Sequence, residues 1–236
     1  MKYFLLTFFL SVFSFSFSQV SYYDWDLSAI SHEAYRIKMK TGKYLSVKVQ
    51  ENKNQLFYKL RRKEIFGQLD TTTHQQLRMA LQKEYHLQTE NVLFIHYIDT
   101  LPVVSQMPAK DTLIQYQKKD SAGNIINAHR HLMSFETEKK NITKEIQKFK
   151  KWKQVTFVQL VNEVNDYPST IEDHRIMKDP MLLFRKVFSD GFQPYVNIIL
   201  YPDGSFAMTA RQMNESEIKR RLNKKKFEKE KKNWNP

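Results

Sequence analysis

Two histidines two positions apart are the side chains whose type and spacing best suit a metal. His129 and His131 fall in a segment expected to be a strand, where residues i and i+2 point to the same face. Such a pair holds zinc or copper when a third ligand lies nearby, and His96, His174 and Glu136 are the candidates for it. Two solvent-facing histidines on a hairpin are the other interpretation, and the sequence predicts no cofactor.

The chain has no cysteine among its 236 residues. Thiol–disulfide exchange needs a thiolate as the attacking group, so this oxidoreductase activity is excluded. The helical zinc motif H-E-x-x-H, a glycine-rich phosphate loop and the nucleophile elbow G-x-S-x-G are also missing. No enzymatic activity is therefore indicated, and no catalytic residue is assigned.

Positive charge gathers at the C-terminus of a chain whose formal net charge is +13. Between Lys219 and Lys232, nine lysines and arginines stand against two glutamates, which gives nine minus two, or +7, for the segment. Such a block is typical of a solvated helix, or it docks on a polyanion such as nucleic acid, a cell-wall polymer or an anionic lipid surface. The candidate polyanion-binding residues are Lys219, Arg220, Arg221, Lys224, Lys225 and Lys226.

The first eighteen residues have the arrangement of a secretory signal peptide. Lys2 precedes an apolar stretch from Phe4 to Phe17, and small residues stand at Ser16 and Ser18. We expect cleavage after Ser18 and a soluble secreted or periplasmic protein with no membrane span. An uncleaved anchor is the alternative, although the run is shorter and richer in serine than a spanning helix of roughly 20 residues requires.

Residues 19–87 are expected to form an N-terminal segment with a hairpin and a helix. Residues 19–36 show no clear period and are interpreted as a lead-in. Apolar residues then alternate from Leu45 to Leu60 around a polar tip at residues 51–54, which predicts a hairpin with one wet face. Thr72 and Gln75 form a capping-box pattern that predicts a helix over residues 72–87.

Two continuous apolar runs, Val92–Ile98 and Val155–Val164, predict neighbouring strands covered on both faces. The amphipathic pattern over residues 138–151 places a helix between them, which makes a βαβ crossover. Residues 112–117 and 125–132, joined by a turn at residues 121–124, predict an inserted hairpin.

The stretch from Asp179 to Met208 organises the rest of the chain. Asp179 and Pro180 fit the cap and first position of a helix reaching about Phe188. Residues 195–201 then form an apolar strand, residues 202–205 have turn chemistry, and a second strand begins at Phe206. Asn214, with Glu217 three residues later, predicts the cap of a last helix.

This order of helix, proline, strand, Asp-Gly turn and antiparallel strand resembles the C-terminal half of thioredoxin-like domains. The resemblance covers roughly residues 88–222 and implies an α/β fold: a thioredoxin-like central mixed sheet flanked by helices. The N-terminal hairpin and the inserted hairpin are additions to that pattern. The expected domain spans residues 88–218, with a basic tail over residues 219–236.

The resemblance also implies a peptide-docking edge without redox chemistry. The position that carries the redox motif in active relatives corresponds to residues 99–106, which contain no sulfur nucleophile. Gln193 is implied as the residue whose backbone pairs with an extended partner, and Pro194 as the following proline, with a cis or an ordinary trans bond. We expect a secreted or periplasmic protein that binds an unknown protein or peptide, and polyanion binding through the basic tail is the alternative.

Overall fold

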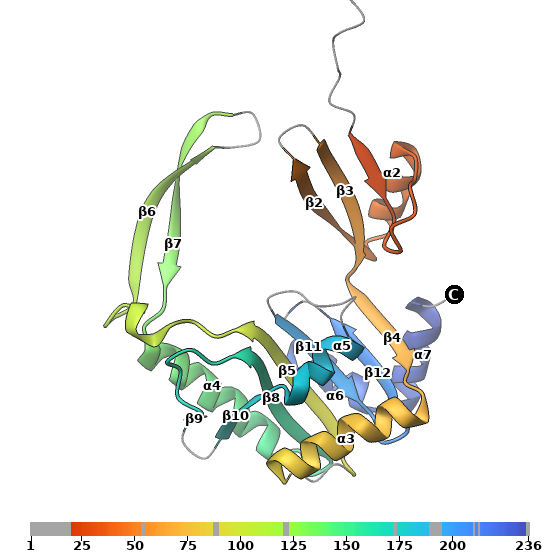
Figure 1. The fold of residues 1–236 in the computed structure, drawn as a ribbon, viewed down its shortest axis with the longest axis vertical. Coiled ribbons are helices and arrows are strands. Elements are labelled where there is room, and N and C mark those ends of the chain that lie inside the picture. Colours follow the sequence, from red (N-terminus) through yellow and green to blue (C-terminus); the bar gives the residue numbers. More distant parts are fainter. Residues whose placement is uncertain are drawn as a thin grey trace, which may run out of the picture. The chain divides into compact units, whose positions relative to one another are not determined.

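The computed structural model describes residues 20–52, 55–86, 90–119, 123–171, 174–188, 195–209, 211 and 213–234 (Figure 1). The chain divides into two compact units, Met1–Glu64 and Ile65–Pro236, and each is described by itself. The expected signal peptide and the residues Gln193 and Pro194 lie outside the described residues.

The first unit is a three-stranded sheet with one helix. Strand β3 (Gln55–Arg62) lies between β1 (Ser21–Tyr23), to which it is parallel, and β2 (Tyr44–Asn52), to which it is antiparallel. The predicted hairpin is therefore confirmed. Residues 19–36, interpreted as a lead-in without a period, instead supply β1 and the start of helix α2 (His32–Lys40).

Aromatic packing explains why this part of the first unit has regular structure without a hydrophobic period. The ring of Tyr22 on β1 stacks on Tyr58 of β3, with centroids 5.8 Å apart, and lies 4.9 Å from the ring of Tyr35 on α2. The Ser31 hydroxyl caps α2 by accepting a hydrogen bond from the Ala34 amide at 3.1 Å. Large rings thus stabilise elements that are too short to show a pattern.

The second unit is built on a seven-stranded mixed sheet in the order β4-β12-β11-β5-β8-β10-β9. Its strands are β4 (Glu64–Gln68), β5 (Val92–Thr100), β8 (Val155–Glu163), β9 (Thr170–Ile171), β10 (His174–Lys178), β11 (Tyr195–Leu200) and β12 (Ser205–Thr209). Strand β5 is parallel to β8 and antiparallel to β11, and β11 is antiparallel to β12. The predicted neighbouring strands are all confirmed. Their continuous apolar runs need cover on both faces, which a central position in the sheet provides.

Helices cover both faces of this sheet (Figure 1). On one face, Leu77 and Leu81 of α3 (Thr71–Tyr85) and Phe184 pack against Leu93 and Ile95 of β5. On the other face lie α4 (Phe135–Lys150), α6 (Glu215–Leu222) and α7 (Lys224–Trp234). The structure is thus a mixed α/β fold with a large mixed sheet flanked by helices.

Two predicted helix starts are wrong in detail. Helix α3 is capped by Asp70, not by Thr72, since the Asp70 carboxylate accepts a hydrogen bond from the Thr73 amide at 2.9 Å. The predicted helix from Pro180 to Phe188 is split into a 3₁₀ turn (Pro180–Leu182) and α5 (Leu183–Val187). The break comes from Met181 and Leu182, whose φ angles of 53° and 55° are left-handed.

Asp179 is responsible for the later helix start. Its carboxylate accepts hydrogen bonds from the Phe184 amide at 3.0 Å and the Arg185 amide at 2.9 Å. The side chain therefore satisfies the first free amides of α5, not those after Pro180. Burial raises the pKa of this carboxyl group, while the two amides oppose the rise.

The inserted hairpin is confirmed as β6 (Thr112–Lys119) and β7 (Ile125–Leu132). The two strands form a separate two-stranded sheet that extends away from the seven-stranded one (Figure 1). At its base, the Asp111 carboxylate accepts hydrogen bonds from the amide and hydroxyl of Ser134, at 2.8 and 2.9 Å. Ser134 also caps α4, so the hairpin is tied to the first turn of that helix.

Among the described residues, no helix combines the length and the apolar character needed to cross a bilayer.

Candidate functional site

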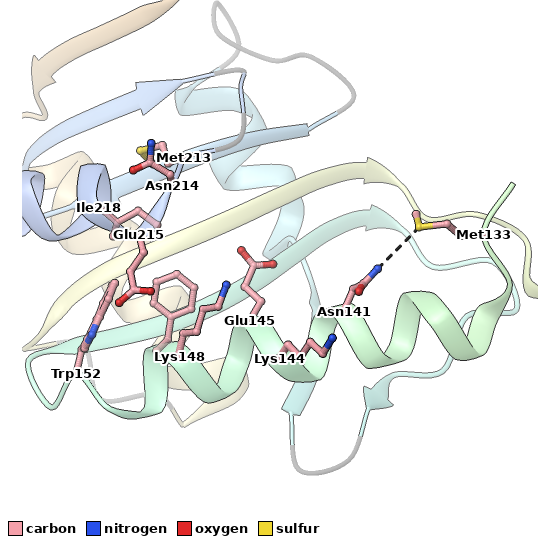
Figure 2. A pocket seen from close by; sticks show the side chains of 11 residues that line it. Met133, Asn141, Lys144, Glu145, Lys148, Trp152, Met213, Asn214, Glu215 and Ile218 are labelled. Atoms are coloured by element: carbon pink, nitrogen blue, oxygen red, sulfur yellow. Dashed lines mark hydrogen bonds between the residues drawn. The ribbon is translucent and has the colours of Figure 1, made fainter. Parts of the chain in front are cut away.

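A groove of about 700 Å³ lies between helix α4 and the start of helix α6 in the second unit (Figure 2). Five apolar side chains line it: Met133, Phe149, Trp152, Met213 and Ile218. Six polar or charged side chains complete the lining: Asn141, Lys144, Glu145, Lys148, Asn214 and Glu215. The groove therefore combines an apolar surface with polar groups of both charges.

Helix α4 supplies one wall because of its period. Asn141, Glu145, Lys148 and the following Trp152 are spaced by three or four residues, which puts them on one face of the helix. Figure 2 shows the side chains of Glu145 and Lys148 pointing from α4 towards the opposite wall. The Asn141 amide nitrogen contacts the sulfur of Met133 at 3.8 Å, which joins the two residues at one end of the groove.

The opposite wall is the capped start of α6. Asn214 accepts a hydrogen bond from the Glu217 amide at 2.9 Å, which confirms the predicted cap. Glu215 pairs with Lys219 at 2.6 Å, and the Lys219 ammonium lies 5.5 Å from the ring centroid of Trp152. This cation–π contact joins the two walls at the second end of the groove.

The two carboxylates of the groove differ in their electrostatics. The hydrogen bond and charge of Lys219 lower the pKa of Glu215, which therefore stays ionised. Burial raises the pKa of Glu145, and the nearby Lys148 only partly offsets this. One wall thus presents a fixed negative charge, and the other a carboxyl group that gains a proton more readily.

A row of polar side chains crosses the sheet face that α4 covers. Thr209, Asn197, His96 and Gln159 are aligned on the adjacent strands β12, β11, β5 and β8. Thr209, Asn197 and Gln159 are buried, with 1%, 5% and 2% of their surface exposed. On either side of the row the same face is apolar, because Phe94 and Ile199 pack in one cluster and Ile98 and Val161 in another.

His96, at the middle of this row, is neutral near pH 7. Burial lowers its pKa to about 4, although part of the side chain remains accessible. Asn197 donates a hydrogen bond to the carbonyl of Arg211 at 2.9 Å. For His96 and Gln159, no side-chain hydrogen bond is found within the described part of the chain. A neutral imidazole and an amide therefore keep donor and acceptor groups available there.

The polar row lies at the level of Glu145 on α4. Phe149 stacks on Phe94 and Phe157, with ring centroids 4.7 Å apart in both pairs. About two turns before Phe149 on α4, Ile142 packs with Ile98 and Val161. Glu145 lies between Phe149 and Ile142 along the helix, as His96 lies between Phe94 and Ile98 along β5.

Sequence reasoning did not identify this row, although a signal was present. Each of the three strands predicted to be neighbours has one polar residue in the middle of its apolar run: His96, Gln159 and Asn197. Polar residues at matching positions of adjacent buried strands indicate a polar row on one face.

The predicted metal pair is on one face, as expected, but no third ligand joins it. His129 is opposite Gln115 and His131 opposite Leu113 in the hairpin. Within the described ranges, no group of three His, Cys, Asp or Glu side chains is close enough to hold a metal ion. Of the suggested partners, His174 instead stacks on Phe157 at 5.1 Å.

The structure divides the predicted polyanion-binding residues into paired and exposed ones. Arg221 is buried and lies 3.1 Å from both Glu217 and Glu230, and Lys224 lies 2.7 Å from Asp203. Four of the six residues make such ion pairs: Lys219, Arg220, Arg221 and Lys224. The expectation of a solvated segment is therefore wrong for its buried part, while Lys225 and Lys226 are exposed as predicted.

Comparison with protein-family models, curated proteins and solved structures finds no match for this chain. The functional interpretation therefore rests on the fold and on the groove.

Proposed function

We propose that the protein is a thioredoxin-like binding module without redox activity, and that the groove beside α4 binds a peptide segment of a partner protein. The observation that carries this proposal is the groove itself, with its apolar lining, amide groups and mixed charges. The strand order β12-β11-β5-β8, with β5 parallel to β8 and antiparallel to β11, supports the thioredoxin-like assignment.

The lining favours a peptide over a polyanion. Lys144 and Lys148 are balanced by Glu145 and Glu215, so the groove has no excess of positive charge. Its apolar residues include two methionines and a tryptophan, which adapt to varied apolar side chains. The amides of Asn141 and Asn214 can pair with the backbone of an extended segment.

The proposal keeps secretion through residues 1–18 and leaves Gln193 and Pro194 as a second peptide-contacting segment. The absence of cysteine removes thiol chemistry, so binding is the property of this domain that remains. Polyanion binding through the C-terminal segment is the alternative, and the ion pairs of Lys219, Arg220, Arg221 and Lys224 argue against it.

A peptide selection tests the proposal. The full secreted chain is presented to a display library of random peptides, and selected peptides are measured for affinity by fluorescence anisotropy. We expect apolar or aromatic residues to be enriched. Asn141→Trp, which fills the groove from an exposed position, should weaken binding by about tenfold or more.

The matched control is Gln147→Trp, an exposed position on the same helix that does not line the groove. It should leave peptide affinity unchanged. Equal loss in both variants, or selected peptides that bind both as well as the wild type, would contradict a groove-bound peptide. Binding of DNA or heparin that Lys225→Glu with Lys226→Glu abolishes would favour the alternative.

A further inference from the structure

The inserted hairpin leaves apolar side chains exposed on both of its faces. The strand register puts Ile114, Tyr116 and Ile126 on one face and Leu113 and Ile125 on the other. Leu113 and Ile125 are 65% and 66% exposed, and the three residues of the first face are 37–42% exposed. Two-stranded ribbons of this kind are marginally stable on their own in water, so this exposure calls for a partner.

The charge of the two hairpin strands has one sign. Its two strands contain Lys118, Lys119 and Arg130 and no aspartate or glutamate. Lys118 is opposite Ile126 and Lys119 is opposite Ile125, so cationic and apolar groups alternate near the tip. The complementary surface is therefore anionic and apolar at once.

We propose that this hairpin docks on an anionic lipid surface. A protein partner on one face would leave the apolar residues of the other face in water, whereas the boundary between headgroups and acyl chains surrounds a thin ribbon. The three cationic side chains then reach the phosphates, and Leu113, Ile114, Tyr116, Ile125 and Ile126 enter the apolar layer.

The backbone sets the depth of docking. The two strands form a sheet of two, so each has an outer edge whose backbone groups find no neighbouring strand in the sheet. Hydrocarbon does not tolerate unpaired N–H and C=O groups, whereas water among the headgroups satisfies them. The hairpin therefore lies in the interface and does not cross the bilayer.

A second copy of this chain is a poorer occupant. Pairing two hairpins would bring three further positive charges against the first three, with no carboxylate in either pair of strands to offset them. Nucleic acid would use the cations but not the exposed Leu113 and Ile125.

Vesicle cosedimentation with the full secreted chain tests the charge requirement. We expect binding to vesicles of phosphatidylcholine with about one third phosphatidylglycerol, and little binding to phosphatidylcholine alone. Lys118→Glu with Lys119→Glu should reduce partitioning by about tenfold or more. Lys225→Glu with Lys226→Glu makes the same charge change at exposed residues of α7 and should have a much smaller effect.

A second pair of variants tests the apolar requirement. Leu113→Ser with Ile125→Ser should also lower partitioning by about tenfold. Met79→Ser on α3 removes an equally exposed apolar side chain (65%) outside the hairpin and should leave partitioning unchanged.

A labelled variant keeps the test independent of whether charge-reversed hairpins fold. Because the chain has no cysteine, Gln117→Cys provides a single attachment site for an environment-sensitive fluorophore. Its emission should shift to the blue with the anionic vesicles, while a label at Lys226→Cys should not respond.

Three results would overturn the proposal: no binding to the anionic vesicles, equal losses for the Lys118/Lys119 and Lys225/Lys226 variants, or no response of the label at position 117. A concentration-dependent dimer that the Leu113/Ile125 variant abolishes would instead assign the surface to a second copy. The outcome is separate from the groove proposal, because peptide affinity is measured without lipid.

Discussion

The C-terminal helices and the inserted hairpin contain similar residues in opposite situations. Helices α6 and α7 are cationic and carry the apolar residues Ile218 and Phe227, which are 4% and 0% exposed. The hairpin is also cationic, but its Leu113 and Ile125 are 65% and 66% exposed. The apolar residues of a cationic segment are thus part of the core in the C-terminal helices and face solvent in the hairpin.

Carboxylates make the difference between these regions. Glu217 and Glu230 pair with Arg221, and Asp203 and Glu228 pair with Lys224. The hairpin strands have no such partners of their own. A count of positive charge therefore does not locate a binding surface, because paired cations are engaged in folding and only unpaired, exposed ones remain for a partner.

The largest expected effect is the loss of a core ring in the C-terminal helices. Phe227→Ala should lower the free energy of unfolding by about 3–5 kcal/mol, because the ring is fully buried and lies 4.8 Å from that of Tyr201. Leu113→Ala in the hairpin should change it by less than about 0.5 kcal/mol. Denaturant unfolding of both variants measures the difference, and equal values would refute the contrast.

Removing the buried cation should have the next largest effect. Arg221→Met leaves Glu217 and Glu230 without their shared partner and should destabilise the protein by about 3 kcal/mol. This is the low end for a buried pair, because Arg211 and Arg220 still contact the two carboxylates. Lys225→Met, at an exposed residue of the same segment, is the control, and a loss as large as that of Arg221→Met would contradict the distinction.

Much of the second unit could be predicted from the sequence, because its central strands are continuous apolar runs. Residues 92–98, 155–164 and 195–201 each need cover on both faces, which indicates neighbours in a central sheet. Strands β1 and β4 were not predicted, because three and five residues are too few to show a period. The break at Met181 was also missed, since it depends on Asp179 bonding to amides further along the chain.

The candidate groove could not be predicted, because its walls are far apart in the sequence. Lys148 and Glu215 come from helices separated by five strands in chain order, and only the packing of both helices on one sheet face brings them together. The solvated interpretation of the basic segment was wrong for a related reason. Two of the pairs, Glu217 with Arg221 and Glu228 with Lys224, are i,i+4 contacts within one helix. The contacts of Glu230 with Arg220 and Arg221 instead depend on how α7 packs against α6.

The next comparison is between His96 in the large sheet and His129 in the hairpin, and it concerns how the free energy of unfolding depends on pH. His96 has a folded-state pKa of about 4, below its usual 6.5, so the unfolded chain takes up the proton first as the pH falls. The stabilisation is therefore complete above pH 6.5 and is lost between pH 6.5 and about 4. We expect a loss of about 2 kcal/mol by pH 4.5, less than the full shift implies because the ring is partly accessible.

His96→Gln should remove this pH-dependent loss, and His129→Gln in the hairpin should retain it. Denaturant unfolding of the three proteins at pH 7.5, 5.5 and 4.5 gives the comparison, with each variant measured against the wild type so that other titrating groups cancel. The carboxyl group of Glu145 acts in the opposite direction, because a raised pKa favours folding at low pH. A slope that persists in His96→Gln would show that another group is responsible.

The smallest expected effect concerns the attachment of the hairpin to α4. Hydrogen bonds from the amide and hydroxyl of Ser134 and from the Thr137 hydroxyl lower the pKa of Asp111. Asp111→Ala should leave global unfolding almost unchanged, because the side chain is exposed and the hairpin adds little to the core. It should, however, speed hydrogen exchange of the β6 and β7 amides, since the base of the ribbon is no longer tied to the helix.

The same link predicts a pH dependence that is local to the hairpin. A lowered pKa means that the attachment is intact above the ordinary aspartate value and is lost as the pH falls through the folded-state value. Exchange of the β6 and β7 amides, corrected for intrinsic rates, should therefore accelerate in acid in the wild type and not in Asp111→Ala. Acceleration of the same size in both proteins would place the attachment elsewhere, and global unfolding on loss of Asp111 would mean that the hairpin belongs to the core after all.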